Sequence, residues 1–288
     1  MKSKTNNYFS IFIIWVLLVS LNACSLIDPA SPTPCYVKID SIQLLTDYAT
    51  QGSSSNKITD AWVLVDGVYL GTFPLPCTFP IAGTGQHEIK IKGGIIEDGI
   101  AGIRAAYPKY NSFDTTFILQ AAQIYTIHPR VSYETFTAFP NMEDFDDASL
   151  NLVTTTQGNT PITIISPPDP NVFEGNSGKV TLVDTNIVFE VAANAPFYLP
   201  INTLTFVELN YKSDIDFVVG VYITASSVVK QELLSIRASS TWKKIYININ
   251  DLGGVVSNGI AYKIYLRAEK PSTVTSANLY FDNFKVVY

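Results

Sequence analysis

The chain has 288 residues, of which 19 are Lys or Arg and 25 are Asp or Glu, so that its formal charge at pH 7 is −6. This acidic balance argues against a surface that holds nucleic acid or anionic lipid by charge. The length suits one large or two ordinary domains, and a change of composition near residue 140 favours two.

Residues 1–23 are typical of a signal peptide. Lys2 and Lys4 precede an apolar run at 11–19, which is far shorter than the roughly 20 residues of a spanning helix. The sequence Leu-Asn-Ala-Cys at 21–24 resembles the lipobox of bacterial lipoproteins, which implies cleavage before Cys24 and acylation of its thiol by chains such as palmitate. The alternatives are a plain secretory signal with an accidental cysteine, and an uncleaved anchor.

The segment that follows Cys24 is expected to be a tether. Residues 24–35 contain Pro29, Pro32 and Pro34, and proline-rich segments are extended and semi-rigid. Acyl chains contribute about 0.8 kcal/mol per buried methylene, so two chains anchor a protein without a spanning helix. We therefore expect a protein that is lipid-anchored to the outer membrane, on the cell surface or on the periplasmic face.

Two further cysteines, Cys35 and Cys77, are left once Cys24 carries lipid. In an oxidising compartment they are expected to form a disulfide, which would contribute roughly 4 kcal/mol through the loop that it closes. The alternative is a pair of unbonded, buried thiols.

Residues 36–139 show short alternating segments without helical periodicity, which predicts a β-sandwich. Asp66-Gly67 between two such segments indicates a hairpin turn. The stretches 62–71, 74–80 and 85–91 resemble a PEGA-type or carboxypeptidase-regulatory-like module, which implies an immunoglobulin-like spacer or adhesion domain. Residues 93–110, which include Arg104, are expected to be a long connection rather than a binding loop. Strands are expected at 36–45, 61–65, 68–73, 87–92, 113–119 and 123–131.

Residues 140–288 are expected to form a second all-β domain, a jelly-roll sandwich, because many short strands alternate with turn residues. The stretches 143–147, 240–247 and 279–286 are similar to the galactose-binding-like jelly rolls, a superfamily that includes many carbohydrate-binding modules. Strands are expected at 150–156, 162–166, 179–183, 186–191, 204–212, 217–224, 228–236, 243–249, 261–267 and 277–287.

The same resemblance implies a structural calcium ion held by Asp282 with Asp144 and with Asp146 or Glu143. Calcium takes six to eight oxygen ligands, and several carboxylates that meet where the first and last strands pair would repel one another without a cation. The alternative is that these acids face water.

Sugar recognition needs flat aromatic faces together with planar polar groups for the hydroxyls. Aromatic residues and arginines in the second domain meet this description, although core packing is the preferred interpretation of each one taken singly. The candidate ligand-binding residues are Tyr198, Tyr222, Arg237, Trp242 and Arg267.

Catalysis is not expected. The only histidines, His87 and His128, lie in predicted strands of the first domain, so a nucleophile with a positioned base is hard to build. No phosphate-binding loop or zinc-type spacing occurs. A glycosidase that uses acids from 143–147 is the least favoured alternative.

The leading hypothesis is a non-enzymatic envelope lipoprotein whose second domain binds a polysaccharide. The rival is a structural or interaction subunit of an outer-membrane secretion, gliding or uptake complex, because fold does not dictate function. The tripeptides at 40–42 and 114–116 are similar to the O-glycosylation sequon of Bacteroidetes, which agrees with export.

Overall fold

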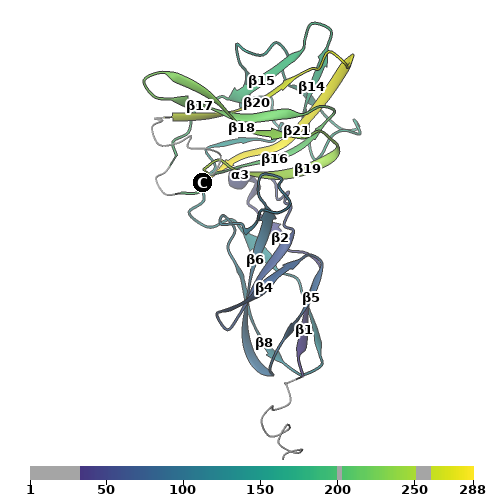
Figure 1. Ribbon diagram of the computed structural model, residues 1–288, viewed down its shortest axis with the longest axis vertical. Helices are drawn as coiled ribbons and strands as arrows, with labels where there is room; N and C mark the ends of the chain where they lie inside the picture. The colour runs from purple at the N-terminus through teal and green to yellow at the C-terminus, as the bar shows by residue number, and fades with distance from the viewer. Residues whose placement is uncertain (1–32, 200–202, 251–260) are drawn as a thin grey trace, which may run out of the picture.

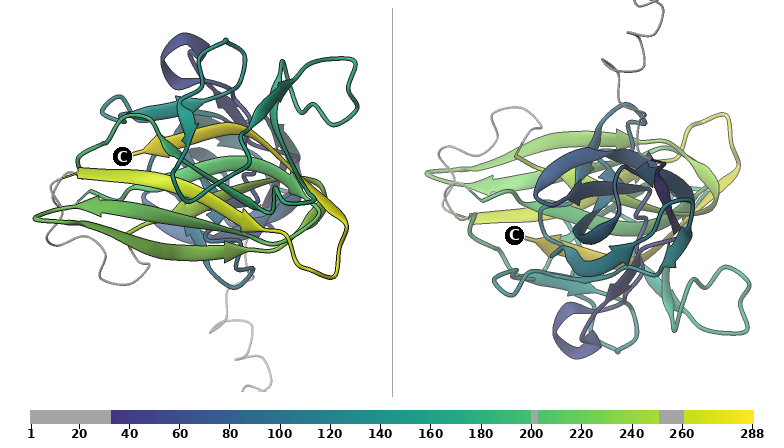
Figure 2. Two further views of the ribbon diagram at one scale, coloured as in Figure 1. Left: turned by 90° about the horizontal axis from the view of Figure 1, so that it is seen from above. Right: turned by 90° about the horizontal axis from the view of Figure 1, so that it is seen from below.

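The computed structural model describes residues 33–199, 203–250 and 261–288. Two sandwich domains are stacked along the long axis of the molecule (Figure 1). Strands of the N-terminal domain run along this axis, whereas those of the C-terminal sandwich run across it (Figures 1 and 2). The predicted all-β class with two sandwiches is confirmed. The predicted signal peptide and Cys24 lie outside the described residues.

In the N-terminal domain, β1 (Cys35–Ile39) lies between its two partners in a three-stranded sheet. Its alternate residues Cys35, Val37 and Ile39 are buried, as the period of a half-buried strand requires. Asp66 and Gly67 both have positive φ, which matches the predicted hairpin turn. The other elements are β2 (Gln43–Leu45), α3 (Tyr48–Gln51), β3 (Asp60–Val65), β4 (Val68–Pro74), β5 (Cys77–Ile81), β6 (Gly85–Ile96), β7 (Arg104–Ala106), β8 (Phe113–Leu119), β9 (Ile124–Ile127) and β10 (Arg130–Ser132).

Three sheets build this domain, with orders β5-β1-β9, β4-β3-β6-β7 with β8 beside β6, and β10-β2. The strands expected at 36–45 and 123–131 are each divided in two, because β1 and β9 pair in one sheet whereas β2 and β10 pair in another. The connection expected at 93–110 is shorter than predicted, since residues 93–96 continue β6.

The predicted disulfide is wrong. Cys35 and Cys77 are both free thiols. The antiparallel register pairs Cys35 with Ile81 and Cys77 with Ile39, so the two cysteines lie at opposite ends of the same strand pair. A disulfide requires that the two Cα atoms lie within about 7 Å of each other. Cys35 and Cys77 are four residues apart along the strand pair, and at about 3.3 Å per residue this distance is well beyond that limit.

The C-terminal domain packs a six-stranded sheet, with order β13-β14-β21-β16-β19 and β11 beside β21, on a five-stranded sheet with order β12-β15-β20-β17-β18. Buried aliphatic and aromatic residues from both sheets form one core between them. The strands are β11 (Asn141–Glu143), β12 (Leu152–Thr154), β13 (Thr163–Ile165), β14 (Ser177–Val183), β15 (Val188–Ala193), β16 (Phe206–Ser213), β17 (Phe217–Thr224), β18 (Val228–Ile236), β19 (Ser239–Asn248), β20 (Ala261–Glu269) and β21 (Ser276–Val287).

The six-stranded sheet faces the N-terminal domain (Figure 1). Phe206, Tyr246 and Val287 of this sheet are buried in the hydrophobic cluster of the N-terminal domain. Outer-face side chains of the sheet are therefore covered rather than solvated, and the two domains share an interior. Within the described residues, no helix is long and apolar enough to span a bilayer.

Candidate functional site

A groove of about 540 Å³ lies where residues 53–59, here called the serine strap, cross the outer face of the six-stranded sheet. The strap connects α3 to β3, and the opposite wall comes from β16 and β19. The groove is lined by Ser55, Asn56, Lys57, Thr59, Ile96, Gly99, Phe173, Asn210, Thr241, Trp242, Lys243, Lys244, Ile245 and Tyr246.

The polar floor of the groove follows from the alternation of β16. Val207 and Leu209 face the core of the sandwich, and because successive side chains of a strand point to opposite faces, Glu208 and Asn210 face the N-terminal domain. Both of these polar residues are buried, so each one needs hydrogen-bond partners from the domain that covers it.

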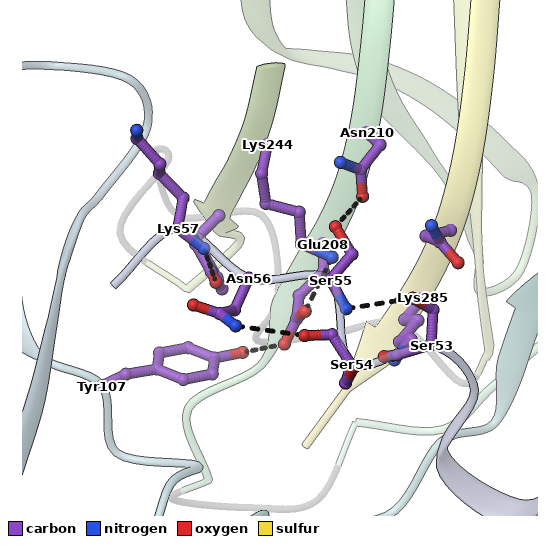
Figure 3. Close-up of polar contacts among 12 residues, drawn as sticks. Ser53, Ser54, Ser55, Asn56, Lys57, Tyr107, Glu208, Asn210, Lys244 and Lys285 are labelled. Atoms are coloured by element: carbon purple, nitrogen blue, oxygen red, sulfur yellow. Dashed lines mark hydrogen bonds and ion pairs between the residues drawn. The ribbon is translucent and has the colours of Figure 1, made fainter. Parts of the chain in front are cut away.

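Asn210 is held by the serine strap. Its side-chain oxygen accepts a hydrogen bond of 3.0 Å from the Ser55 hydroxyl (Figure 3). Beside it, the backbone N–H of Lys57 donates to the Tyr246 hydroxyl over 2.9 Å. These bonds join the strap to two strands of the other domain, so the groove is formed before any ligand arrives.

Aromatic side chains close one end of the groove. The rings of Trp242 and Phe173 lie 5.2 Å apart between centroids, and Tyr280 of β21 lies 6.5 Å from Trp242. Trp242 is partly exposed, and both Trp242 and Phe173 line the groove. An apolar ring surface and the amide of Asn210 therefore line the same groove.

A buried charge cluster supports the groove from below. Glu208 Oε1 accepts hydrogen bonds of 2.9 Å from the hydroxyls of Tyr107 and Tyr133 (Figure 3 shows the Tyr107 bond). Burial raises the pKa of both tyrosines well above the ordinary value, so they stay protonated and donate. Lys244 Nζ lies 3.1 Å from the other oxygen of Glu208.

Lys285 fixes the strap from the last strand. Its Nζ donates a 2.7 Å hydrogen bond to the carbonyl oxygen of Ser53 and lies 5.4 Å from the centroid of the Tyr133 ring. Burial, reinforced by the nearby Lys244, lowers the pKa of Lys285 to about 8. At neutral pH the group is therefore mostly charged and holds the two domains together.

A second polar cluster, outside the groove, lies on the outer face of the five-stranded sheet. Tyr222 and Arg267, two of the predicted ligand-binding residues, converge on the buried carboxylate of Glu190, with Lys230 beside them. Burial opposes ionisation of Glu190, but the hydrogen bonds from Lys230 and Tyr222 outweigh it and hold the pKa below its ordinary value. Tyr222 and Arg267 are thus engaged by a protein carboxylate.

The remaining predicted ligand residues are dispersed. Trp242 lines the groove, whereas Tyr198 and Arg237 are exposed and are not among its lining residues. The structure therefore brings Tyr222 and Arg267 together, on the sheet opposite Trp242. Sequence analysis missed Asn210, Phe173 and the serine strap, because the strap belongs to the other domain and no local pattern links it to β16.

The predicted calcium ligands are not brought together. The Glu143 carboxylate accepts hydrogen bonds from the backbone N–H groups of Phe145 and Asn151. Asp144 and Asp146 both accept hydrogen bonds from the Tyr48 hydroxyl, over 2.9 and 2.8 Å. Asp282 is buried separately and accepts a hydrogen bond from the Ser177 hydroxyl. No group of three or more His, Cys, Asp or Glu side chains within the described ranges could hold a metal. These carboxylates do not fit the predicted site, and a calcium ion elsewhere stays a prediction.

No protein-family model matches the chain, and no curated protein matches it. Several solved structures are similar to about half of it. The family 11 carbohydrate-binding module from Clostridium thermocellum, in complex with a β-1,3-1,4-mixed-linked tetrasaccharide, is 14% identical with a TM-score of 0.37, over 50% of this chain and 93% of that chain.

Two further structures show comparable similarity. The family 30 module of a cellulosomal cellulase of the same organism is 11% identical with a TM-score of 0.33, over 47% of this chain and 85% of that one. TmCBM61 in complex with β-1,4-galactotriose is 12% identical with a TM-score of 0.31, over 51% of this chain and 88% of that one.

Proposed function

We propose that this protein is a non-enzymatic envelope lipoprotein that binds glycan in the groove between its two domains. The observation that carries the proposal is that the Trp242 ring and the buried amide of Asn210 line one groove, which the bond from Ser55 holds in place. A pyranose presents a flat C–H face and a rim of hydroxyls, so it needs an apolar ring beside planar hydrogen-bonding groups.

The dimensions of the groove support this proposal. Its volume of about 540 Å³ lies within the range of roughly 300 to 1,000 Å³ that is typical of small-molecule sites. Because Ser55 and Lys57 are already bonded to the C-terminal domain, little conformational entropy is lost when a ligand binds.

Binding is favoured over hydrolysis by the chemistry of the lining. Glycoside hydrolysis ordinarily requires two carboxyl groups that face the scissile bond. Among the described residues that line the groove there is no Asp, Glu or His. The acids at 143–147, which were the least favoured alternative, are not among the lining residues either.

The anchoring part of the proposal rests on the sequence of residues 21–24. The described chain begins at the end of the molecule that is furthest from the C-terminal sandwich (Figure 1). An anchor that precedes β1 would therefore hold the groove away from the membrane. Radiolabelled palmitate should enter the wild-type chain and not a Cys24→Ala variant, and equal labelling of both would contradict the anchor.

Glycan binding is tested with the full-length chain, purified in detergent, on a polysaccharide array. Trp242→Ala should weaken binding at least about tenfold, because it removes the ring that stacks on the sugar. Tyr198→Ala is the matched control, since Tyr198 is an exposed aromatic outside the groove, and it should bind like wild type. A wild-type chain that is retained by no polysaccharide would overturn the proposal.

The rival role, a subunit of an envelope assembly, is favoured by one feature of the N-terminal domain. On the edge strand β4, the consecutive residues Val68, Tyr69 and Leu70 are exposed. Exposed apolar edges pair readily with other chains. A photocrosslinker at Val68 should capture a stoichiometric envelope partner in cells if this role is correct, and Tyr69→Lys should abolish the capture.

A further inference from the structure

The lining of the groove differs in charge from the rest of the chain. Although acids outnumber bases overall, the lining contains Lys57, Lys243 and Lys244 and, among the described residues, no carboxylate. We propose that the groove takes an anionic saccharide, one that carries carboxylate or sulfate groups. This inference rests on the proposed glycan-binding function and specifies its ligand class.

Two of the three lining lysines are available to a ligand. Lys243 and Lys57 are both exposed, and neither forms an ion pair within the part of the chain that the structure describes. An ammonium group without a carboxylate partner at the edge of a groove favours an anion there. Lys57 belongs to the serine strap and Lys243 to β19, the last strand of its sheet.

The charge cluster below the groove is balanced by carboxylates and does not add to this preference. The side chain of Lys244 is 3% exposed, and Lys285 is also buried. Within the described residues, Glu208 is the one carboxylate within ion-pair distance of Lys244, and it is shared with two tyrosine hydroxyls. Lys285 instead donates to a neutral carbonyl. Burial lowers the pKa of Lys285, but the carboxylates of Glu208, Glu174 and Asp144 all raise it. The two buried ammonium groups therefore have several carboxylates nearby, and the preference for an anion rests on Lys57 and Lys243.

The groove also offers hydrogen-bond donors without a partner among the described residues. The side-chain oxygen of Asn210 is occupied by the Ser55 hydroxyl, whereas its nitrogen has no partner among the described residues. The Asn56 oxygen accepts from the backbone of Ile58. Donors on Asn210, Lys57 and Lys243 are therefore free for a ligand, while the side-chain oxygens of Asn210 and Asn56 are used. A ligand rich in acceptors, such as a carboxylated or sulfated sugar, complements this arrangement.

The test uses pairs of polymers that differ only in charge. The probes are polygalacturonate with its fully methyl-esterified form, and a sulfated galactan with its desulfated form. The full-length chain in detergent should bind at least one charged polymer about tenfold more tightly than its uncharged counterpart. This preference should shrink as salt is raised from about 0.05 M to 0.5 M, because screening weakens exposed charges.

Variants locate the charged contact. Lys57→Gln and Lys243→Gln should each weaken binding of the charged polymer roughly three- to tenfold and weaken binding of its uncharged counterpart by a smaller factor, so that the preference for the charged polymer falls. Lys38→Gln is the control, since Lys38 is exposed on β1 and is not among the lining residues. Urea unfolding of each variant confirms that the fold is intact.

Three results would overturn the inference. Equal binding of charged and uncharged polymers, with Trp242→Ala defective for both, would refute the charge preference and leave glycan binding in place. Charged binding that is insensitive to Lys57→Gln and Lys243→Gln would place the anion outside the groove. Binding of a neutral glycan on the array, with none of the charged probes bound, would refute the ligand class alone.

Discussion

Three carboxylates of the C-terminal domain, Glu190, Glu208 and Asp282, are fully buried, and each is stabilised in a different way. Glu190 meets two cations, Glu208 meets one cation and two hydroxyls, and Asp282 meets a hydroxyl and backbone N–H groups. Because a buried charge is costly unless it is paired, the three are expected to respond differently to substitution and to pH.

Glu190→Ala should lower the free energy of unfolding by about 2 kcal/mol, because it leaves Lys230 and Arg267 without their shared partner. The loss falls below that of a fully buried pair, since these side chains are 31% and 25% exposed and regain water. The matched control is Glu269→Ala, whose carboxylate contacts Arg267 but is 61% exposed, and it should cost less than about 0.5 kcal/mol. Urea titration measures both, and equal costs would contradict the assignment.

The raised pKa of Asp282 predicts that the free energy of unfolding decreases as the pH rises. Burial raises the pKa of Asp282 to about 7, above the value of about 3.9 in an unfolded chain. Between these values the folded state holds the proton more tightly than the unfolded state. The contribution of this group to stability is therefore full below about pH 4, decreases by up to about 1.4 kcal/mol per pH unit, and levels off above pH 7.

Asp282→Asn isolates this contribution, because the amide is close in shape to the acid and does not ionise. The free energy of unfolding of the variant relative to wild type should increase from pH 4 to pH 7 and then stay constant. Chemical denaturation at several pH values measures the difference. A difference that is independent of pH would show that Asp282 keeps an ordinary pKa.

At the scale of single elements, the connection between β6 and β7 protects a sheet edge. β19 is the last strand of its sheet, and an open edge invites pairing with other chains. The backbone N–H of Asp98 donates to the Tyr246 carbonyl over 2.8 Å, and the Asp98 carboxylate accepts from the backbone N–H of Asn248 over 2.9 Å. Asp98 adopts a φ of 54°, a conformation that Asp and Asn tolerate better than most residues.

Asp98→Ala should therefore destabilise the protein by about 2 kcal/mol. The variant leaves the Asn248 N–H without its acceptor and places an alanine in the left-handed region. Asp98→Asn keeps an acceptor and tolerates the backbone angle, so most of the stability should return. Thermal unfolding compares the three proteins, and identical melting temperatures for the alanine and asparagine variants would contradict this role.

At the scale of the whole molecule, the two domains share one interior. Phe206, Tyr246 and Val287 of the C-terminal sheet belong to the hydrophobic cluster of the N-terminal domain. The rings of Tyr107 and Phe206, one from each domain, lie 4.9 Å apart between centroids. Interfaces of this kind are more hydrophobic than those between freely moving domains, so the two sandwiches are expected to unfold together.

Tryptophan reporters test this cooperativity. In a Trp15→Phe background, Trp242→Phe leaves Trp62 of the N-terminal domain as the reporter, and Trp62→Phe leaves Trp242 of the C-terminal domain. Adding Phe206→Ala should lower the free energy of unfolding by about 3 to 5 kcal/mol. The unfolding midpoint reported by Trp62 and the one reported by Trp242 should both move to the same new value. Separate midpoints, or a shift confined to Trp242, would mean that the domains unfold independently.

The sequence by itself determined the all-β class, most strands and the Asp66-Gly67 hairpin. The alternation of apolar residues and the residue preferences of turns involve only a few neighbouring residues. They can therefore be recognised in the sequence before the fold is known. Trp242 was also recognised as a candidate from its residue type.

Only the tertiary structure decided where the site lies and which charges meet. The register of β1 with β5 separated Cys35 from Cys77, and docking of the domains brought Ser55 to Asn210, which lies 155 residues further along the chain. Such pairings depend on which faces of the two sandwiches bury most favourably against each other. The favoured arrangement of the two domains depends on the summed free energy of many long-range contacts. No local pattern in the sequence predicts this arrangement.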